Sequence, residues 1–126
     1  LSISESVEKA DTSAQEDDLS DDDRKFAEKL KGFITDNIGN SDLVVQDLAD
    51  TMCVSRTVLF AHVKRVFGCS PNNLILNMRI NRAKELLAKG NPLIADVAYR
   101  CGFSDPKYFS RCFKKITGKK PKEWKA

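Results

Sequence analysis

The sequence has few of the residues from which catalytic and metal sites are built. Its 126 residues include one histidine, His62, and four cysteines at positions 53, 69, 101 and 112, with no C-x-x-C pair. Structural zinc sites need about four such ligands at regular spacing, so we expect no metal site. The chain also has no glycine-rich phosphate loop, no Cys–His arrangement and no recognisable carboxylate pair. We therefore expect neither a cofactor nor an enzyme.

Long apolar runs are missing too. No run exceeds five residues, whereas a membrane-spanning helix needs about 18 or more, and no secretory signal is visible. We expect no membrane contact by this segment, a cytoplasmic location and four reduced thiols. Cys53, Cys101 and Cys112 fall within helical apolar patterns, where a free cysteine packs as a small hydrophobic residue.

Charge is plentiful but unevenly distributed. Residues 1–23 contain nine acidic residues against the single base Lys9, whereas the other 103 residues contain 20 Lys and Arg against nine acids. We expect residues 1–19 to be an acidic, disordered linker that either stays solvated or folds back on the basic part. Residues 20–126 are expected to form one basic domain that suits a polyanion, although basic surfaces also serve solubility alone.

Apolar residues recur at helical spacing through the basic part, which predicts an all-α fold. The first predicted helix begins at Ser20, an N-cap with Asp23 three residues later, and ends at Gly39-Asn40. Its apolar stripe is Phe26, Leu30, Phe33, Ile34 and Ile38. Near the C-terminus, Trp124 is expected to anchor a last short helix rather than to stack on a ligand.

The sequence then repeats itself. A short helix over 45–52, the turn CVS and a helix over 56–67 are followed by a second set: 94–101, GFS and 105–117. Asp47, Ala49 and Ser55 recur at an offset of 49 as Asp96, Ala98 and Ser104. Lys64, Gly68 and Pro71 recur at an offset of 50 as Lys114, Gly118 and Pro121, because the second turn has one extra residue. Two helix-turn-helix units are predicted, at about 43–68 and 93–118.

A long linker helix is predicted between the units, over 71–89. Pro71 suits its first turn, Leu76, Ile80, Ala83 and Leu87 form a stripe, and Gly90-Asn91-Pro92 ends it. Nineteen residues make a rod of about 28 Å. Because major grooves recur about every 34 Å, two units held this way suit successive turns on one face of a DNA duplex.

In the second unit the helix over 105–117 separates into two faces. The buried face predicted from the spacing is Phe109, Cys112, Phe113 and Ile116, and the free face is Lys107, Ser110, Arg111 and Lys114. Arg111 can grip a guanine edge with two hydrogen bonds, and Lys107 and Ser110 can reach bases or phosphate. Lys114 is assigned to the DNA backbone, as are Lys119 and Lys120 after the helix, and Lys122 is expected to flank the duplex beside them. An ordinary solvated basic face is the alternative.

The matching face of the first unit is Thr57, Phe60, Ala61 and Lys64, with Arg56 at the helix start. Arg56 and Lys64 are expected to contact backbone. Phe60 either approaches a thymine methyl or packs inward, and Ala61 offers only a methyl group. Elsewhere, Arg79 and Arg82 on the linker helix bind phosphate or pair within the protein. His62 is expected at the edge of helix packing, without a chemical role.

The string AYRCGFSDPKYFSRCFKKITGKKPKEW resembles the second helix-turn-helix of the AraC/XylS family of transcription regulators. The stretch LADTMCVSRTVLFAHVKRVFGCSPNNLILNMRINRAKELL is similar to the family's first unit and linker helix, so the resemblance covers about residues 24–126.

The resemblance implies about seven helices and binding of adjacent major grooves in double-stranded DNA. It gives base-reading roles to Thr57, Phe60 and Ala61, and to Lys107, Ser110 and Arg111. Many members have a polar residue and an arginine where this chain has Phe60 and Ala61, which puts base reading by the first unit in question. Cys53 stands where the turn often has glycine, and a positive φ there would strain it by about 1 kcal/mol, so the first turn is expected to be less regular than the second.

The acidic leader and the absence of an initiating Met are compatible with the output domain of a hybrid two-component regulator. RNA polymerase is then a candidate second partner, and dimerisation is expected through a domain missing from this chain. A helical protein–protein module whose basic faces meet an acidic partner is the competing interpretation, and the salt dependence of DNA binding separates the two.

Overall fold

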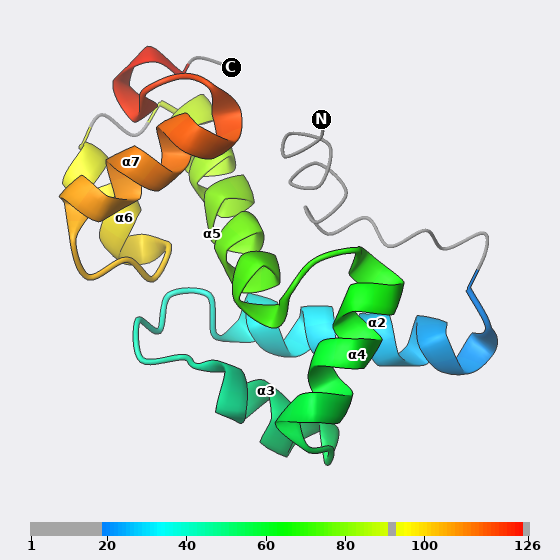
Figure 1. The fold of residues 1–126 in the computed structure, drawn as a ribbon. Coiled ribbons are helices and arrows are strands. Elements are labelled where there is room, and N and C mark those ends of the chain that lie inside the picture. Colours follow the sequence, from blue (N-terminus) through cyan, green and yellow to red (C-terminus); the bar gives the residue numbers. More distant parts are fainter. Residues whose placement is uncertain (1–18, 91–92, 125–126) are drawn as a thin grey trace.

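Two small helical units pack at either end of one long helix (Figure 1). The structure is a computed structural model that describes residues 19–90 and 93–124, and within these ranges it contains helices and no strand. The elements are α2 (Asp21–Asp36), α3 (Val45–Met52), α4 (Arg56–Phe67), α5 (Pro71–Ala88), α6 (Ile94–Arg100), α7 (Pro106–Thr117) and the 3-10 helix η2 (Pro121–Glu123). The predicted all-α fold, two helix-turn-helix units on a linker helix, is confirmed.

Serine N-caps start three of these helices. The hydroxyl of Ser20 accepts the N–H of Asp23 at 3.1 Å, as the sequence predicted. Ser55 and Ser70 do the same for α4 and α5, each at 3.2 Å, and Pro71 fills the first turn of α5. Each cap satisfies an amide that the helix itself leaves without a partner, which is worth about 1 kcal/mol.

The first helix ends earlier than the sequence predicted. α2 stops at Asp36 with Asn37 as its C-cap, whereas Gly39-Asn40 was the predicted end. The side-chain amide of Asn37 donates to the carbonyl of Phe33 at 2.9 Å, and its backbone N–H reaches Phe33 and Ile34. Because these bonds satisfy the last carbonyls of the helix, residues 37–40 are released to form a turn.

Two separate cores share the long helix α5. Leu74, Ile75 and Met78 belong to the core of the first unit, with α2, α3 and α4. Ile80, Ala83, Leu86 and Leu87 belong to the core of the second unit, with α6 and α7. The predicted stripe of α5 therefore describes only the second core, since the first core uses a different face of the same helix.

The cysteines follow the prediction at two positions and depart from it at a third. Cys101 and Cys112 are buried in the second core, and all four thiols are unpaired. Cys53 is not packed among the helices: it is the exposed C-cap of α3, in the left-handed conformation with φ 60°. The apolar pattern of α3 ends one residue earlier, so the Cys53 side chain leaves the buried face. Trp124 does anchor the chain end, edge-on to Phe113 at 5.6 Å between ring centroids.

Candidate nucleic-acid interface

The second unit presents the face of α7 that the spacing predicted. Phe109, Cys112 and Phe113 are buried, and Ile116 is half-buried against the same core. On the opposite side Lys107, Arg111 and Lys114 are exposed and Ser110 is half-buried. Asp105 starts the helix by accepting the N–H of Lys107 at 3.0 Å. The four predicted side chains therefore share one solvent-facing surface of a well-capped helix.

Arg111 lies along this surface without a carboxylate partner among the described residues. Its guanidinium carbon stands 5.8 Å from the ring centroid of Tyr108, which is itself exposed. A cation over an aromatic face is held by the ring quadrupole but keeps its N–H groups available at the edge of the guanidinium plane. Arg111 is therefore partly preorganised to donate two parallel hydrogen bonds to a planar acceptor.

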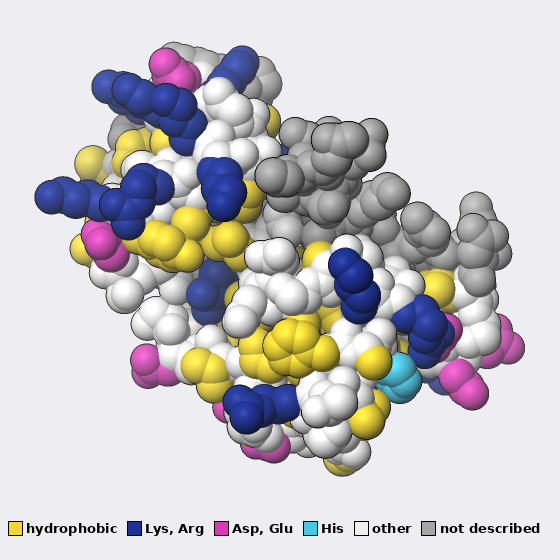
Figure 2. Space-filling model, viewed as in Figure 1, with side chains coloured by type: hydrophobic (Ala, Val, Ile, Leu, Met, Phe, Trp, Pro, Cys, Tyr) yellow, Lys and Arg dark blue, Asp and Glu magenta, His cyan; other side chains and the backbone are white. Residues whose placement is uncertain are grey.

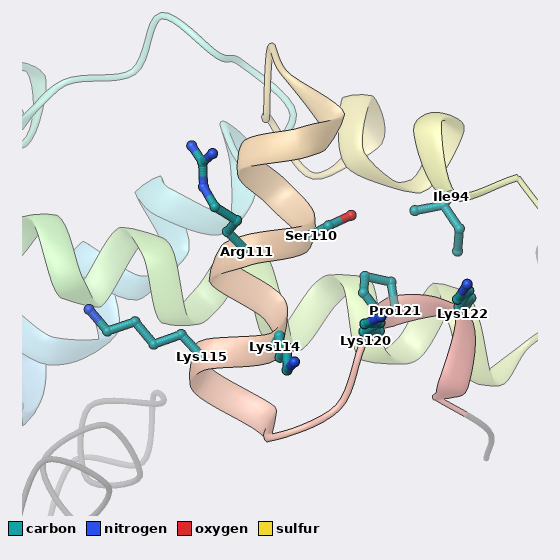
Figure 3. Close-up of a pocket in the computed structure, with 8 residues that line it drawn as sticks. All are labelled: Ile94, Ser110, Arg111, Lys114, Lys115, Lys120, Pro121 and Lys122. Carbon is teal, nitrogen blue, oxygen red and sulfur yellow. The ribbon is translucent and has the colours of Figure 1, made fainter.

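A groove of about 600 Å³ runs beside α7, between this helix, the start of α6 and η2 (Figure 3). Ser110 and Ile94 point toward each other across it, whereas Arg111 and Lys115 extend away from it. Its lining residues are Ile94, Ser110, Arg111, Lys114, Lys115, Lys120, Pro121 and Lys122. Five of these residues are cationic, so the groove lies in a basic part of the surface.

The predicted DNA-backbone residues differ in their position relative to this groove. Lys114 and Lys120 line it, whereas Lys119 is exposed but does not line it. Lys122, which was expected to flank the duplex together with Lys119 and Lys120, also lines the groove. The repeat agrees with this position, since Lys122 corresponds to Asn72 at an offset of 50, and both residues follow the proline that starts the next helix.

The first unit has an equivalent face of different chemistry. α4 buries Leu59, Val63, Val66 and Phe67. The predicted contact residues Arg56, Thr57, Phe60, Ala61 and Lys64 are all exposed. Because 43% of the Phe60 side chain is exposed, the alternative in which it packs inward is wrong. A large aromatic ring that stays in solvent on a recognition face is available for apolar contact with a ligand.

A second groove, of about 520 Å³, lies beside α4. It is lined by Val45, Arg56, Thr57, Phe60 and Asn72. Three of these residues have repeat equivalents in the groove beside α7: Ile94 for Val45, Ser110 for Phe60 and Lys122 for Asn72. The internal repeat has therefore produced two corresponding grooves: five cationic side chains line the one beside α7, whereas Arg56 is the single cationic residue lining the one beside α4.

The same contrast is visible over the surface. Figure 2 shows basic side chains gathered over the second unit, while over the first unit apolar side chains occupy the middle and the basic ones stand singly around them. Acidic side chains on this face lie mainly toward its margins.

The arginines of the linker helix are engaged within the protein. Arg82 pairs with Glu85 at 2.9 Å, and Arg79 donates from Nη2 to the carbonyl of Asn40 at 2.8 Å. The intramolecular alternative for these two residues is thereby confirmed. His62 stands edge-on to Phe26, with 4.9 Å between ring centroids, at the margin of the first core as predicted.

Among residues 19–90 and 93–124, no group of three or more His, Cys, Asp or Glu is placed to hold a metal ion. No helix in these ranges has the length and apolar character needed to cross a membrane.

A family model described as "Helix-turn-helix domain" matches residues 48–126. The arabinose operon regulatory protein of Escherichia coli is 35% identical over 94 residues, covering 75% of this chain and 32% of that protein. The chain belongs to the AraC/XylS family. Histidine kinase P4 of Formosa agariphila is 33% identical over 102 residues, covering 81% of this chain and 7% of that protein.

The AraC/XylS assignment extends to solved structures. The C-terminal domain of AraT, a response regulator from Geobacillus stearothermophilus, superposes with a TM-score of 0.73 at 30% identity, covering 85% of each chain. This chain thus spans most of that solved chain, but about a third or less of the two curated relatives named above. As a member of the AraC/XylS family, the chain is a sequence-specific DNA-binding domain for transcription regulation, and not an enzyme.

Proposed function

We propose that α4 and α7 enter adjacent major grooves on one face of a DNA duplex, with α5 setting their separation. The observation that carries this proposal is the pair of exposed recognition faces with corresponding grooves at the two ends of one helix. The 18 residues of α5 span about 27 Å at 1.5 Å per residue. Helix diameters and tilts bring that length within reach of the groove repeat of about 34 Å.

The second unit is the base reader in this proposal. Arg111 donates to O6 and N7 of a guanine, while Lys107 and Ser110 contact neighbouring base edges or phosphate. Lys114, Lys119 and Lys120 contact the DNA backbone, and the groove lined by Lys114 and Lys120 is the channel that receives it. The partial preorganisation of Arg111 by Tyr108 lowers the entropy lost when it binds.

The first unit reads shape and apolar features. Phe60 packs against a thymine methyl, while Thr57 and Ala61 add small contacts that allow α4 to lie deep in the groove. Arg56 and Lys64 hold the phosphates on either side. Because Ala61 stands where α7 has Arg111, and Arg56 is assigned to the phosphates, this face discriminates fewer bases than α7 does.

For the whole protein we propose a multidomain signalling regulator in the cytoplasm. Residues 20–126 form its DNA-binding output domain and residues 1–19 its acidic linker. The similarity to a histidine kinase and to a response-regulator domain supports a two-component role. Dimerisation would occur through a domain outside this chain, and RNA polymerase is the second partner expected of an activator.

Salt dependence tests DNA binding directly. Five backbone-contacting side chains, Arg56, Lys64, Lys114, Lys119 and Lys120, predict a slope of about −4.5 in log affinity against log salt. Affinity should then fall about 500-fold between 50 and 200 mM salt. The double variant K114Q/K120Q should reduce the magnitude of the slope to about 2.7. An affinity that hardly changes over this range would instead favour the protein–protein module.

A further inference from the structure

The two units touch at a second place besides α5. The loop that follows α2 reaches the turn between α6 and α7 (Figure 1). A Cβ added to Gly39 would lie 3.1 Å from the carbonyl oxygen of Arg100. One added to Gly102 would lie 2.3 Å from the carbonyl oxygen of Ile38. Backbone therefore meets backbone at this junction, and a side chain at position 102 would not fit.

Arg79 fills the junction from the middle of α5. Its Nη2 donates to the carbonyl of Asn40 at 2.8 Å, in the loop of the first unit. Its Nε and Cζ stand 2.7 and 2.9 Å from where a Cβ on Gly102 would be, in the turn of the second unit. Nε is buried and makes no hydrogen bond, and burial lowers the pKa of the guanidinium. One side chain is thus enclosed by both units.

The position of Arg79 along α5 gives this contact a mechanical consequence. Met78 belongs to the first core and Ile80 to the second, so Arg79 lies where the helix passes from one core to the other. Each unit grips its own part of α5 through apolar contacts, which are non-directional and permit small adjustments about the helix axis. A hydrogen-bonded, close-packed contact away from that axis opposes such a rotation.

We infer that Arg79 is a positioning residue: it fixes the orientation of α4 relative to α7 and thereby selects the spacing of the DNA half-sites. This inference rests on the proposed function, since it concerns how the two recognition helices act together. One base pair of spacing moves a half-site by about 3.4 Å and rotates it by about 35°. A rigid junction distinguishes such steps, whereas a loose one accepts several of them.

The first test uses no DNA. The exposed thiol of Cys53 and a second thiol introduced by K115C carry spin labels, one on each unit. Cys69, Cys101 and Cys112 are buried, and burial raises the pKa of Cys69 and Cys101 to about 11, so these thiols react slowly at neutral pH. Pulsed electron paramagnetic resonance spectroscopy then gives the distribution of distances between the two spin labels.

We expect R79Q to broaden that distribution at least twofold, and R82Q to leave it unchanged. Arg82 is a matched control because it lies three residues along the same helix and pairs with Glu85 at the surface. If R79Q does not melt cooperatively, the same measurement is made on R79K, because lysine keeps the charge and the aliphatic stem of Arg79. A distribution in R79Q as narrow as in the parent overturns the inference, whatever the result with DNA.

The second test measures spacing. Selection of bound duplexes from a random library first gives the two half-motifs and the preferred length of the spacer between them. Duplexes carrying both half-motifs are then made with that spacer and with one base pair removed, one added or two added. The parent should prefer one spacer by at least tenfold, and R79Q should bind all four within about threefold, with its affinity for the second half-motif alone unchanged. A uniform loss on every duplex, with a smaller salt slope, would place Arg79 on phosphate and contradict the inference. Failure of the parent itself to bind DNA would refute the proposed function and leave the label measurement to decide the junction.

Discussion

Cys53 and Gly102 occupy the same position in the two turns and share a positive φ, at 60° and 88° respectively. In both turns the amide of the next residue donates back into the first helix, from Val54 to Ala49 at 3.0 Å and from Phe103 to Ala98 at 2.9 Å. The backbone geometry of the repeat has been kept, although only one copy has the residue that adopts it without strain. Cys53 thus adopts the positive φ that strains a residue with a Cβ, but the expectation of a less regular first turn is wrong, because the turn keeps the hydrogen bond of its counterpart.

Removing the side chain at position 53 and adding one at position 102 should therefore change the free energy of unfolding in opposite directions. C53G relieves about 1–2 kcal/mol of left-handed strain and loses about 0.4–1 kcal/mol to the freer unfolded chain, leaving a gain of up to about 1.6 kcal/mol, or about 0.8 kcal/mol at the middle of both ranges. G102A adds strain and also crowds Ile38, so it should cost about 2 kcal/mol or more. Urea unfolding measures both changes. Equal effects of the same sign would contradict this account of the turns.

Arg111 should set the preference for one base pair. R111A is expected to weaken binding of the preferred duplex by about 1–3 kcal/mol and to relax selectivity at a single position. K115A is the control, since Lys115 is an exposed cation on the same helix that extends away from the groove. Titrations against duplexes substituted one position at a time give the result. A loss that is uniform across those duplexes would place Arg111 on phosphate.

Phe60 should contribute to binding but not to folding. Because Phe60 is 43% exposed and belongs to neither core, F60A should change the free energy of unfolding by no more than about 0.5 kcal/mol. It should weaken binding where the first half-motif has thymine, and replacing that thymine by uracil, which lacks the methyl, should abolish the difference between parent and variant. A61R should add a preference for guanine in the same half-motif. Destabilisation of F60A by several kcal/mol would show that the ring packs inside.

The ion pair between Asp23 and Arg65 predicts a pH dependence. The hydrogen bond from Arg65 lowers the pKa of Asp23 below its ordinary value. A carboxyl with a depressed folded-state pKa stabilises the protein fully above its unfolded pKa of about 3.9, and this contribution disappears as pH falls through the folded value. The difference in Tm between the parent and D23N should therefore be constant from pH 7 to about 5 and should shrink below about 4.

D22N is the matched control for this effect, because Asp22 lies on the same helical turn and shares its dipole. It should show a smaller difference in Tm at every pH. A D23N difference that persists unchanged at the lowest pH would mean that the carboxylate charge is not what stabilises the pair.

Local chemistry made much of this molecule predictable from its sequence. The Ser20 cap, the Pro71 start and the two faces of α7 each depend on residues within about one or two turns of each other. The repeat also identified Lys64 and Lys114 as equivalent residues of the two units, because it relates distant positions by a fixed offset. Sequence patterns reveal the residues whose role is set by residues close to them in the sequence.

The features that were missed depend on contacts between distant segments. Arg79 meets Asn40 and Gly102, 39 residues before it and 23 after it, and no periodicity relates them. The two-sided burial of α5 is hidden for the same reason, since a helix that serves two cores shows no single stripe. Phe60 could not be assigned from spacing alone, because an apolar residue at the edge of a helical stripe fits either face.

The central claim is that two equivalent units read DNA unequally, and selection of bound duplexes from a random library tests it most directly. The account predicts two conserved blocks whose centres lie about one helical turn apart. The block under α7 should contain an almost invariant guanine that degenerates in R111A, and the block under α4 should be weaker and rich in thymine. A single block, or two blocks of equal strength that R111A leaves unchanged, would contradict the account.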